Sequence, residues 1–448
     1  MFPQRQFLDE MVRLTRSGRM KRRTFLERAL ALGLTSSAAS SLLAACGGSG
    51  DSVGGNGAAL NIVWRSELEP AGVYPKLVER FNQSNRDGIH VTFLHSPIDS
   101  ARLHSIFLNM LSVRSSDIDV ISMDIIWPAE FALNQWLSPI TDRWSVSERD
   151  KYLPGPIQGC TLGGQIWAAP LRTDVGLIYY RKDLVPNPPK TWDELTATAQ
   201  DLQSRNVTKY GYVWQGARTE GLVCTFSEVL YGYGGHVLDP DIPRKVTVDS
   251  PETLQALSTM VNWVNTISPT VTGMKSPDDA RAVWERGDAA FMRNWPNAYA
   301  LGNKPTSKVA GKFAVTSMPY GGTNSEGHSV IGGWQLGINA FSSPVRVNAA
   351  WKFIQFMLGE EAQKTLALSS LASTMKSTYQ DSEVQSKTPV FKEIGPILGK
   401  ALPRPVSPRY PDLTTALQTR VEQALIHQSS PADALAALQN DLQLIETL

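Results

Sequence analysis

Three tryptophans stand beside acids or glycines at points where an apolar run ends, and they are the first candidates for binding chemistry. Trp127 follows a short run that contains Asp124, Trp295 precedes a proline, and Trp334 follows two glycines. An aromatic ring can stack on the C–H face of a pyranose, while carboxylates and arginines hydrogen-bond to its hydroxyls. Although most tryptophans pack in cores, this placement at strand ends indicates a carbohydrate site.

Among the carboxylates, Asp124 and Asp174 are the first candidates for contacting the sugar. They also allow a second interpretation, in which the protein hydrolyses a glycoside. A glycoside hydrolase uses two carboxyl groups about 5 to 10 Å apart across the scissile bond. The sequence gives no distance between Asp124 and Asp174, so hydrolysis remains the alternative to binding without turnover. A G-x-S-x-G match at residues 50–54 lies in a Gly-rich segment. It has no strand–turn–helix context to expose a nucleophile, so we assign no catalytic residue there.

Composition argues against several other classes of protein. The 448 residues include 43 Lys and Arg against 42 Asp and Glu, a formal net charge of +1, without a long run of one sign. Nucleic acid is therefore not an expected partner. The three cysteines and six histidines show no metal-ligand spacing, and no phosphate-binding loop is present, so neither metal nor cofactor is expected. We expect Cys160 and Cys224 to be buried thiols, with a disulfide as the alternative.

The first 45 residues have the pattern of an export signal. Arg22 and Arg23 precede an uncharged run of small and apolar residues at 29–45. That run is too short to span a bilayer stably, and the twin arginines indicate the Tat route. We therefore expect residues 1–45 to be removed as a signal peptide.

The signal ends in Leu-Ala-Ala-Cys, which resembles a bacterial lipobox. The match implies that Cys46 becomes the lipid-modified N-terminus, and the Gly/Ser-rich residues 46–58 are typical of a flexible tether. The protein is then expected outside the cytoplasm, anchored to the cell membrane without spanning it. A buried N-terminal helix with an inert cysteine is the alternative.

Beyond the tether, short apolar strands alternate with amphipathic helices, which predicts sheets that are mainly parallel and flanked by helices. Ligands of such sheets bind at the carboxyl ends of the strands. The predicted strands are 59–64, 90–95, 119–123, 175–181, 210–214, 289–293 and 313–318. The predicted helices are 72–82, 100–113, 192–204, 225–233, 251–267, 277–286, 348–359, 360–370, 413–427 and 431–447.

The succession of elements predicts an α/β protein with two lobes. We expect the N-terminal lobe to comprise residues 59–172 and 312–370, and the C-terminal lobe residues 173–311 and 371–448. The strand at 313–318 is interpreted as the return to the first lobe. Several crossings would make a multi-strand hinge and restrict motion to opening and closing.

Short motifs along the mature chain carry a resemblance to one family. They are Met123-Asp124 with Trp127, Asp174-Val175-Gly176-Leu177, Tyr179-Tyr180-Arg181-Lys182-Asp183-Leu184, Trp214-Gln215-Gly216, Glu220-Gly221-Leu222-Val223-Cys224, Gly234-Gly235, Arg293-Asn294-Trp295-Pro296, Gly332-Gly333-Trp334 and Pro403-Arg404-Pro405. Together they resemble the family 1 extracellular solute-binding proteins of ABC sugar importers, particularly the trehalose/maltose-binding proteins. The resemblance implies a maltose-binding-protein-like, type II periplasmic-binding-protein fold. It also implies a monomer that is not an enzyme and that delivers a sugar, such as the disaccharide trehalose or maltose, to separate permease and ATPase subunits.

The resemblance also implies which residues hold the ligand. They are Asp124, Asp174, Trp295, Gly333, Trp334 and Arg404, with an acid at Glu67 or Glu69. This chain departs from the family in having Arg172 where the disaccharide binders place a tyrosine, and an arginine of the first lobe matches either Arg102 or His104. These departures leave the identity of the sugar open. A surface lipoprotein with a structural or signalling role is the third interpretation.

Overall fold

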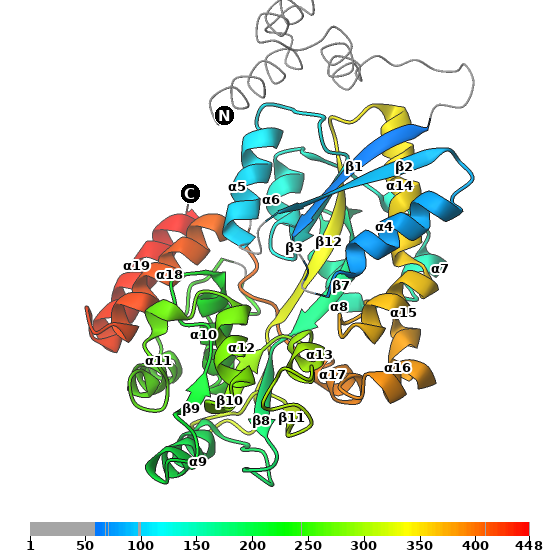
Figure 1. The fold of residues 1–448 in the computed structure, drawn as a ribbon. Helices are drawn as coiled ribbons and strands as arrows, with labels where there is room; N and C mark the ends of the chain where they lie inside the picture. Colours follow the sequence, from blue (N-terminus) through cyan, green and yellow to red (C-terminus); the bar gives the residue numbers. More distant parts are fainter. Residues whose placement is uncertain are drawn as a thin grey trace, which may run out of the picture. The chain divides into compact units, whose positions relative to one another are not determined.

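The computed structural model describes residues 59–67, 69, 71–96, 100–242, 244–407 and 409–447 (Figure 1). The predicted signal peptide, Cys46 and the tether lie outside the described residues. Residues 59–448 form one compact unit. Within the described ranges, every helix is too short or too polar to cross a bilayer.

The first sheet has the order β2-β1-β3-β12-β4, and β7 also pairs with β12. Its strands are β1 (Leu60–Glu67), β2 (Ile89–Ser96), β3 (Val120–Asp124), β4 (Leu137–Ser138), β7 (Ala168–Val175) and β12 (Ile331–Asn339). β1 is parallel to β2 and β3, whereas β12 is antiparallel to β3, β4 and β7. Helices α4 (Val73–Ser84), α5 (Ser100–Leu111), α14 (Pro344–Leu358) and α15 (Glu360–Leu368) flank this sheet (Figure 1).

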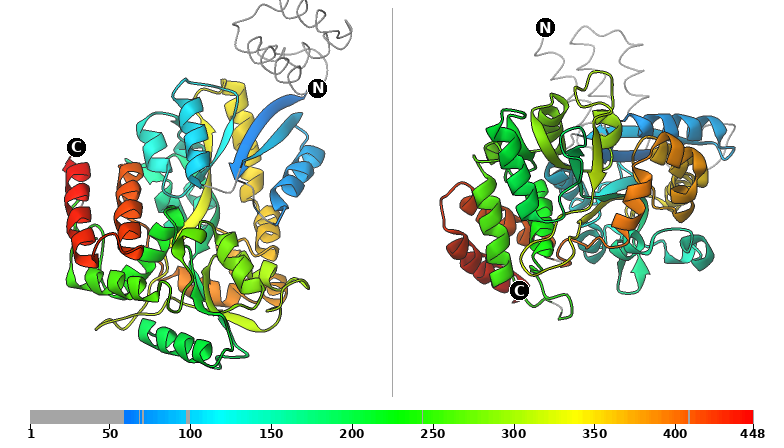
Figure 2. Two further views of the ribbon diagram at one scale, coloured as in Figure 1. Left: turned by 60° about the vertical axis from the view of Figure 1, so that its left-hand side comes forward. Right: turned by 90° about the horizontal axis from the view of Figure 1, so that it is seen from below.

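The second sheet has the order β11-β8-β10-β9. Its strands are β8 (Leu177–Arg181), β9 (Tyr210–Val213), β10 (Ala289–Asn294) and β11 (Phe313–Thr316). Around it lie α9 (Trp192–Ser204), α10 (Glu220–Gly232), α11 (Pro251–Trp263), α12 (Pro277–Glu285), α18 (Tyr410–Leu425) and α19 (Pro431–Thr447). Helices α18 and α19, drawn in orange and red, pack side by side and against α10 and α11 (Figure 2).

Shorter elements connect these layers. They are α6 (Pro128–Leu133), η1 (Thr141–Arg143), α7 (Val146–Arg149), α8 (Pro154–Gly159), β5 (Thr161–Leu162), β6 (Gln165–Ile166), η2 (Val271–Gly273), α13 (Ala298–Gly302), η3 (Lys376–Gln380), α16 (Ser382–Lys387) and α17 (Phe391–Leu398). β5 and β6 pair with each other as a small hairpin.

Two details of the predicted architecture are wrong. The sheets are mixed rather than mainly parallel, since in the second sheet only the β10–β9 pair is parallel. β11 also pairs with β8, with Thr316 opposite Ile178, so the predicted boundary at residue 312 assigned this strand to the wrong lobe. The return to the first sheet comes later, at β12.

Local sequence signals explain where the main helices of the second lobe begin. Thr191 caps α9, where its hydroxyl accepts from the backbone N–H of Glu194, and the Glu194 carboxylate reaches back to the Thr191 N–H. Ser250 and Ser276 cap α11 and α12 in the same position, each followed by a proline. Such caps satisfy N–H groups that have no partner within the helix.

Backbone pairing joins the two sheets through a hinge. β7 leads into β8 across Gly176, and β12 begins beside it, with Ile331 opposite Val175 and Gly332 opposite Asp174. A third strand-like contact comes after α15, where the Thr173 N–H donates to the Ala372 carbonyl over 2.9 Å. Figure 2 shows β12, in yellow, passing along this junction. The chain therefore passes between the sheets more than once, which favours a bending motion over free rotation.

The close packing of α9 on β9 can be tested at Gly211. A methyl group added there would lie 2.3 Å from the Ala199 Cβ. We expect Gly211→Ala to lower the free energy of unfolding, measured by urea denaturation, by about 1–3 kcal/mol. Gly273→Ala is the matched control, because no atom lies within 4 Å of its added methyl group. Equal effects of the two substitutions would contradict this packing.

Candidate functional site

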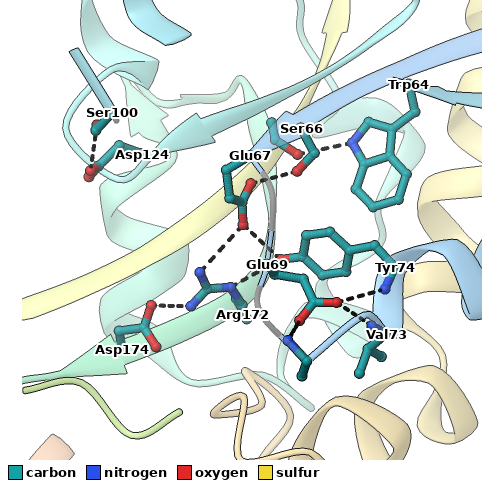
Figure 3. Close-up of polar contacts among 12 residues, drawn as sticks. Trp64, Ser66, Glu67, Glu69, Val73, Tyr74, Ser100, Asp124, Arg172 and Asp174 are labelled. Carbon is teal, nitrogen blue, oxygen red and sulfur yellow. Dashed lines mark hydrogen bonds and ion pairs between the residues drawn. The ribbon is translucent and has the colours of Figure 1, made fainter. Parts of the chain in front are cut away.

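A buried cluster of charged groups joins the end of β1 to the hinge strand β7 (Figure 3). Arg172 Nη1 donates to Asp174 Oδ2, and Arg172 Nη2 lies 3.4 Å from Glu67 Oε1. Tyr74 completes the cluster, donating to Glu67 Oε1 over 3.0 Å and accepting from Arg172 Nε over 3.0 Å. Residues 172 and 174 alternate along a strand and so share one face. The arginine that departs from the family pattern therefore orients both carboxylates.

Glu69, the other candidate acid, accepts hydrogen bonds from backbone N–H groups instead. Its carboxylate accepts from the N–H groups of Val73, of Tyr74 over 3.2 Å and of Ala71 over 2.8 Å. This arrangement caps the first turn of α4, where an anion is favoured. Burial raises the pKa of Glu69, and the backbone donors oppose that rise. Of the two predicted acids, Glu67 is the one that belongs to the charged cluster.

Asp174 has one carboxylate oxygen without a partner. Oδ2 is engaged by Arg172, while the buried Oδ1 has no hydrogen-bond partner among the described residues. Burial raises the pKa of Asp174, Arg172 opposes the rise, and the nearby charges of Glu67 and Asp124 add to it. Asp124 ends β3 and Asp174 lies on β7, and both of these strands pair with β12. A buried acceptor left unpaired costs free energy, so Oδ1 is suited to receive a hydroxyl from a ligand.

Trp295 reaches this carboxylate from the second lobe. A Cβ built on Gly332 would lie 3.1 Å from Cζ3 of Trp295 and 3.3 Å from the Asp174 Cβ. The half-buried indole therefore lies against the hinge strand β12 beside Asp174. Glycine at 332 is what permits this close approach.

Arg404 makes a bridge between elements of the two lobes. Its Nη2 lies 2.7 Å from Asp124 Oδ1 at the end of β3, and its Nη1 lies 2.7 Å from Glu220 Oε1 at the start of α10. Glu220 also accepts from the hydroxyls of Tyr410 and Thr414. Arg404 Nε is buried and has no partner among the described residues. Like Asp174 Oδ1, it is a polar group with unused hydrogen-bonding capacity.

Two further residues were predicted at the site, and the structure places them differently. Trp334 pairs across β12 with Asp124 on β3 and Arg172 on β7 and is 9% exposed. Trp127 lies deeper, in the first core, where its ring stands edge-on to that of Trp334 at 5.8 Å and stacks on Phe131. Trp127 therefore packs against Trp334, and its predicted place at the mouth of the site stays a prediction.

Gly333 allows β12 to lie close against the backbone of β7. Its φ is +136°, a conformation that favours glycine, and a Cβ there would lie 2.5 Å from the Arg172 carbonyl oxygen. His104, one of the two candidates for the family's first-lobe arginine, lies 2.6 Å from Glu130 and packs against Trp127.

The sequence analysis did not identify three charged residues that lie behind the predicted ones: Glu220, Glu228 and Arg293. Glu220 partners Arg404, and Glu228 partners Arg293, whose guanidinium lies 3.9 Å from the centroid of the Trp295 ring. Arg293 and Glu220 lie inside motifs that carry the family resemblance, which was the available signal. Their pairing is not visible in the sequence, since Glu220 and Arg404 are 184 positions apart.

Two other features could carry chemistry, namely the buried cysteines and a cavity in the second lobe. Cys160 and Cys224 are free and buried, which confirms the prediction of thiols. Burial raises the pKa of Cys224 to about 12. Across the described ranges, no three His, Cys, Asp or Glu side chains are grouped as a metal ion would need. A cavity of about 660 Å³ lies in the second lobe, lined by Pro189, Tyr320 and Ile397 among others, and it includes none of the predicted site residues.

Residues 66–364 match the family model of the bacterial extracellular solute-binding proteins, and the chain belongs to this family. It is 32% identical over 377 residues to a "Probable ABC transporter-binding protein" of Deinococcus radiodurans. The matched residues cover 81% of this chain and 88% of that protein. The solved structure of maltose-bound T. maritima MalE3 is 36% identical, with a TM-score of 0.82, covering 86% of this chain and all 100% of MalE3. A Thermotoga lettingae ABC transporter solute-binding protein bound to alpha-D-tagatose, 24% identical, has a TM-score of 0.76 and covers 87% of this chain and 100% of that one. The predicted two-lobed, maltose-binding-protein-like fold is confirmed.

The raised pKa of Asp174 predicts a pH dependence of stability. A carboxyl group whose pKa is higher in the folded state holds its proton longer there, so it stabilises the fold at low pH and loses this effect as pH rises through that pKa. We expect the difference in unfolding free energy between the wild type and Asp174→Asn to favour the wild type most near about pH 4 and to shrink toward about pH 7. Urea denaturation of both proteins across this range measures it. A difference that grows with pH would show that attraction to Arg172 outweighs burial.

Proposed function

We propose that the protein captures an uncharged sugar, a disaccharide such as trehalose or maltose, between its lobes and delivers it to an ABC permease without changing it. The observation that carries this proposal is the unpartnered Asp174 Oδ1 beside the half-buried ring of Trp295. A pyranose stacked on the indole would present hydroxyls to that oxygen. Stacking and charge-assisted hydrogen bonding are together the usual chemistry of carbohydrate recognition.

The site draws on both lobes, which supplies a mechanism for closure. Trp334 and Asp124 belong to the first sheet, Trp295 follows β10 of the second, and Asp174 lies on the hinge strand. Only an arrangement with the lobes together brings these groups to one ligand. Binding then shifts the population toward the closed form, since that form offers the sugar more contacts. The permease would recognise this closed form.

The charges around the site favour an uncharged ligand. Carboxylates outnumber guanidinium groups there, with Glu67, Asp124, Asp174, Glu220 and Glu228 against Arg172, Arg293 and Arg404. A phosphorylated or acidic sugar would bring further negative charge into a buried setting where Arg172, Arg293 and Arg404 are already paired with carboxylates. Maltose bound by MalE3, whose chain is 36% identical, is consistent with this choice.

Hydrolysis is the competing activity, and the family of the chain argues against it. The chain belongs to the bacterial extracellular solute-binding proteins, and a relative of 32% identity is named a probable ABC transporter-binding protein. The two carboxylates of the alternative, Asp124 and Asp174, are each paired with an arginine. We therefore favour binding over turnover.

Calorimetry separates these functions. We expect maltose or trehalose to bind, and trehalose 6-phosphate to bind at least about a hundredfold more weakly because its charge is unpaired. No glucose should appear on prolonged incubation with either disaccharide. Sustained glucose release would establish a hydrolase instead, and equal affinity for the phosphorylated sugar would contradict the argument from charge.

The contribution of Trp295 can be measured in the same way. Trp295→Ala should weaken disaccharide binding at least about tenfold, since it removes the stacking surface. Trp167→Ala is the matched control, because Trp167 is also half-buried but precedes the far end of β7. An unchanged affinity in Trp295→Ala would remove the basis for the proposed site.

We also propose that the mature chain begins at a lipid-modified Cys46, exported as a monomer through the Tat route. Expressed in a bacterium with its full leader, the wild type should fractionate with membranes and incorporate labelled palmitate. Cys46→Ala should lose the label and remain unprocessed by the lipoprotein peptidase. Labelling that persists in Cys46→Ala would refute the lipobox assignment.

A further inference from the structure

We propose that Glu228 is a positioning residue, which fixes the ring of Trp295 through Arg293 and links it to the hinge. This inference rests on the proposed function, because Trp295 is there the surface on which the sugar stacks. Glu228 itself is too deeply buried to touch a ligand, with 1% of its side chain exposed. Its effect on binding therefore has to pass through its neighbours.

The first link is a fully buried ion pair. Arg293 Nε lies 2.7 Å from Glu228 Oε2, and Nη2 lies 2.6 Å from Oε1, while none of the Arg293 side chain is exposed. This bidentate geometry fixes the plane of the guanidinium. A buried arginine that loses its carboxylate is left with an uncompensated charge, so the guanidinium has little freedom to adopt another position.

The second link is the contact between Arg293 and the indole. The guanidinium carbon lies 3.9 Å from the centroid of the Trp295 ring, close enough for a cation–π interaction. One face of the ring is thereby occupied, and its six-membered edge lies against Gly332. The orientation of the remaining face follows from the position of Arg293.

The third link runs from Glu228 to both hinge segments. Oε1 accepts from the Val330 N–H over 3.4 Å, immediately before β12. The same oxygen would lie only 1.8 Å from a Cβ on Gly176, the residue between β7 and β8. One carboxylate thus lies against two of the three segments that connect the lobes. A change in hinge angle moves the carboxylate, and with it the arginine and the stacking ring.

A double-mutant cycle with maltose and trehalose tests the first two links. We expect Glu228→Gln to weaken binding by about fivefold to tenfold, because a neutral amide no longer fixes the guanidinium. In the Trp295→Ala background the same change should have no further effect, since the ring through which it acts is gone. Glu446→Gln is the matched control: Glu446 is also a buried partner of an arginine, Arg244 at 3.1 Å, but lies in α19. It should leave affinity unchanged in both backgrounds.

The cycle distinguishes the two proposals. If Trp295→Ala binds both sugars as the wild type does, the proposed binding site fails. If Trp295→Ala weakens binding but the effect of Glu228→Gln is simply additive to it, the site stands and the positioning role is overturned. Thermal unfolding of each variant shows that an affinity loss is not a loss of folded protein.

Fluorine NMR tests the hinge link without any sugar. In protein labelled with 5-fluorotryptophan, the resonance of Trp295 is the one that disappears in Trp295→Phe. Gly176→Ala and Glu228→Gln should both shift this resonance, although neither residue is assigned a contact with the ring. Gly273→Ala and Glu446→Gln should leave it in place. A Trp295 resonance that is unmoved by Gly176→Ala would overturn the link to the hinge.

Discussion

Three guanidinium groups are almost removed from water, and each must therefore keep a carboxylate. The exposed fractions of the Arg172, Arg293 and Arg404 side chains are 10%, 0% and 3%. An unpaired charge at such depth costs several kcal/mol, so the partners and their elements are held in register. The partners lie at the ends of β1 and β3, on β7 and on α10. The same requirement that stabilises the charges therefore fixes the relative positions of strands, hinge and helix.

These pairings leave a few polar atoms and one indole face unused, and in the proposed function the ligand binds to them. Asp174 Oδ1 and Arg404 Nε have no partner among the described residues. The indole of Trp295 is held on one face by Arg293 and borders Asp174 through Gly332. A ligand that offers hydroxyls and an apolar ring face fits what is left over. Because the surrounding groups are already oriented, binding loses little free energy to their ordering.

Local patterns were enough to predict the fold class and the positions of Asp124 and Trp295 at strand ends. The motifs are short and sequential, so a single sequence contains them. What failed depends on a contact distant in sequence, because the four-residue β11 takes its sheet from its register with β8. Glu69 was separable from Glu67 only once the turn into α4 was seen. The roles of Glu220 and Glu228 likewise emerge from pairing in space.

The central claim is that groups from both lobes and the hinge converge on one sugar. A crystal structure of the protein with maltose tests it most directly. The account predicts one sugar ring stacked on Trp295, a hydroxyl donating to Asp174 Oδ1, and Arg404 Nε donating to the same ligand. Maltose bound instead in the cavity lined by Pro189, Tyr320 and Ile397, with Asp174 Oδ1 still unpartnered, would contradict it.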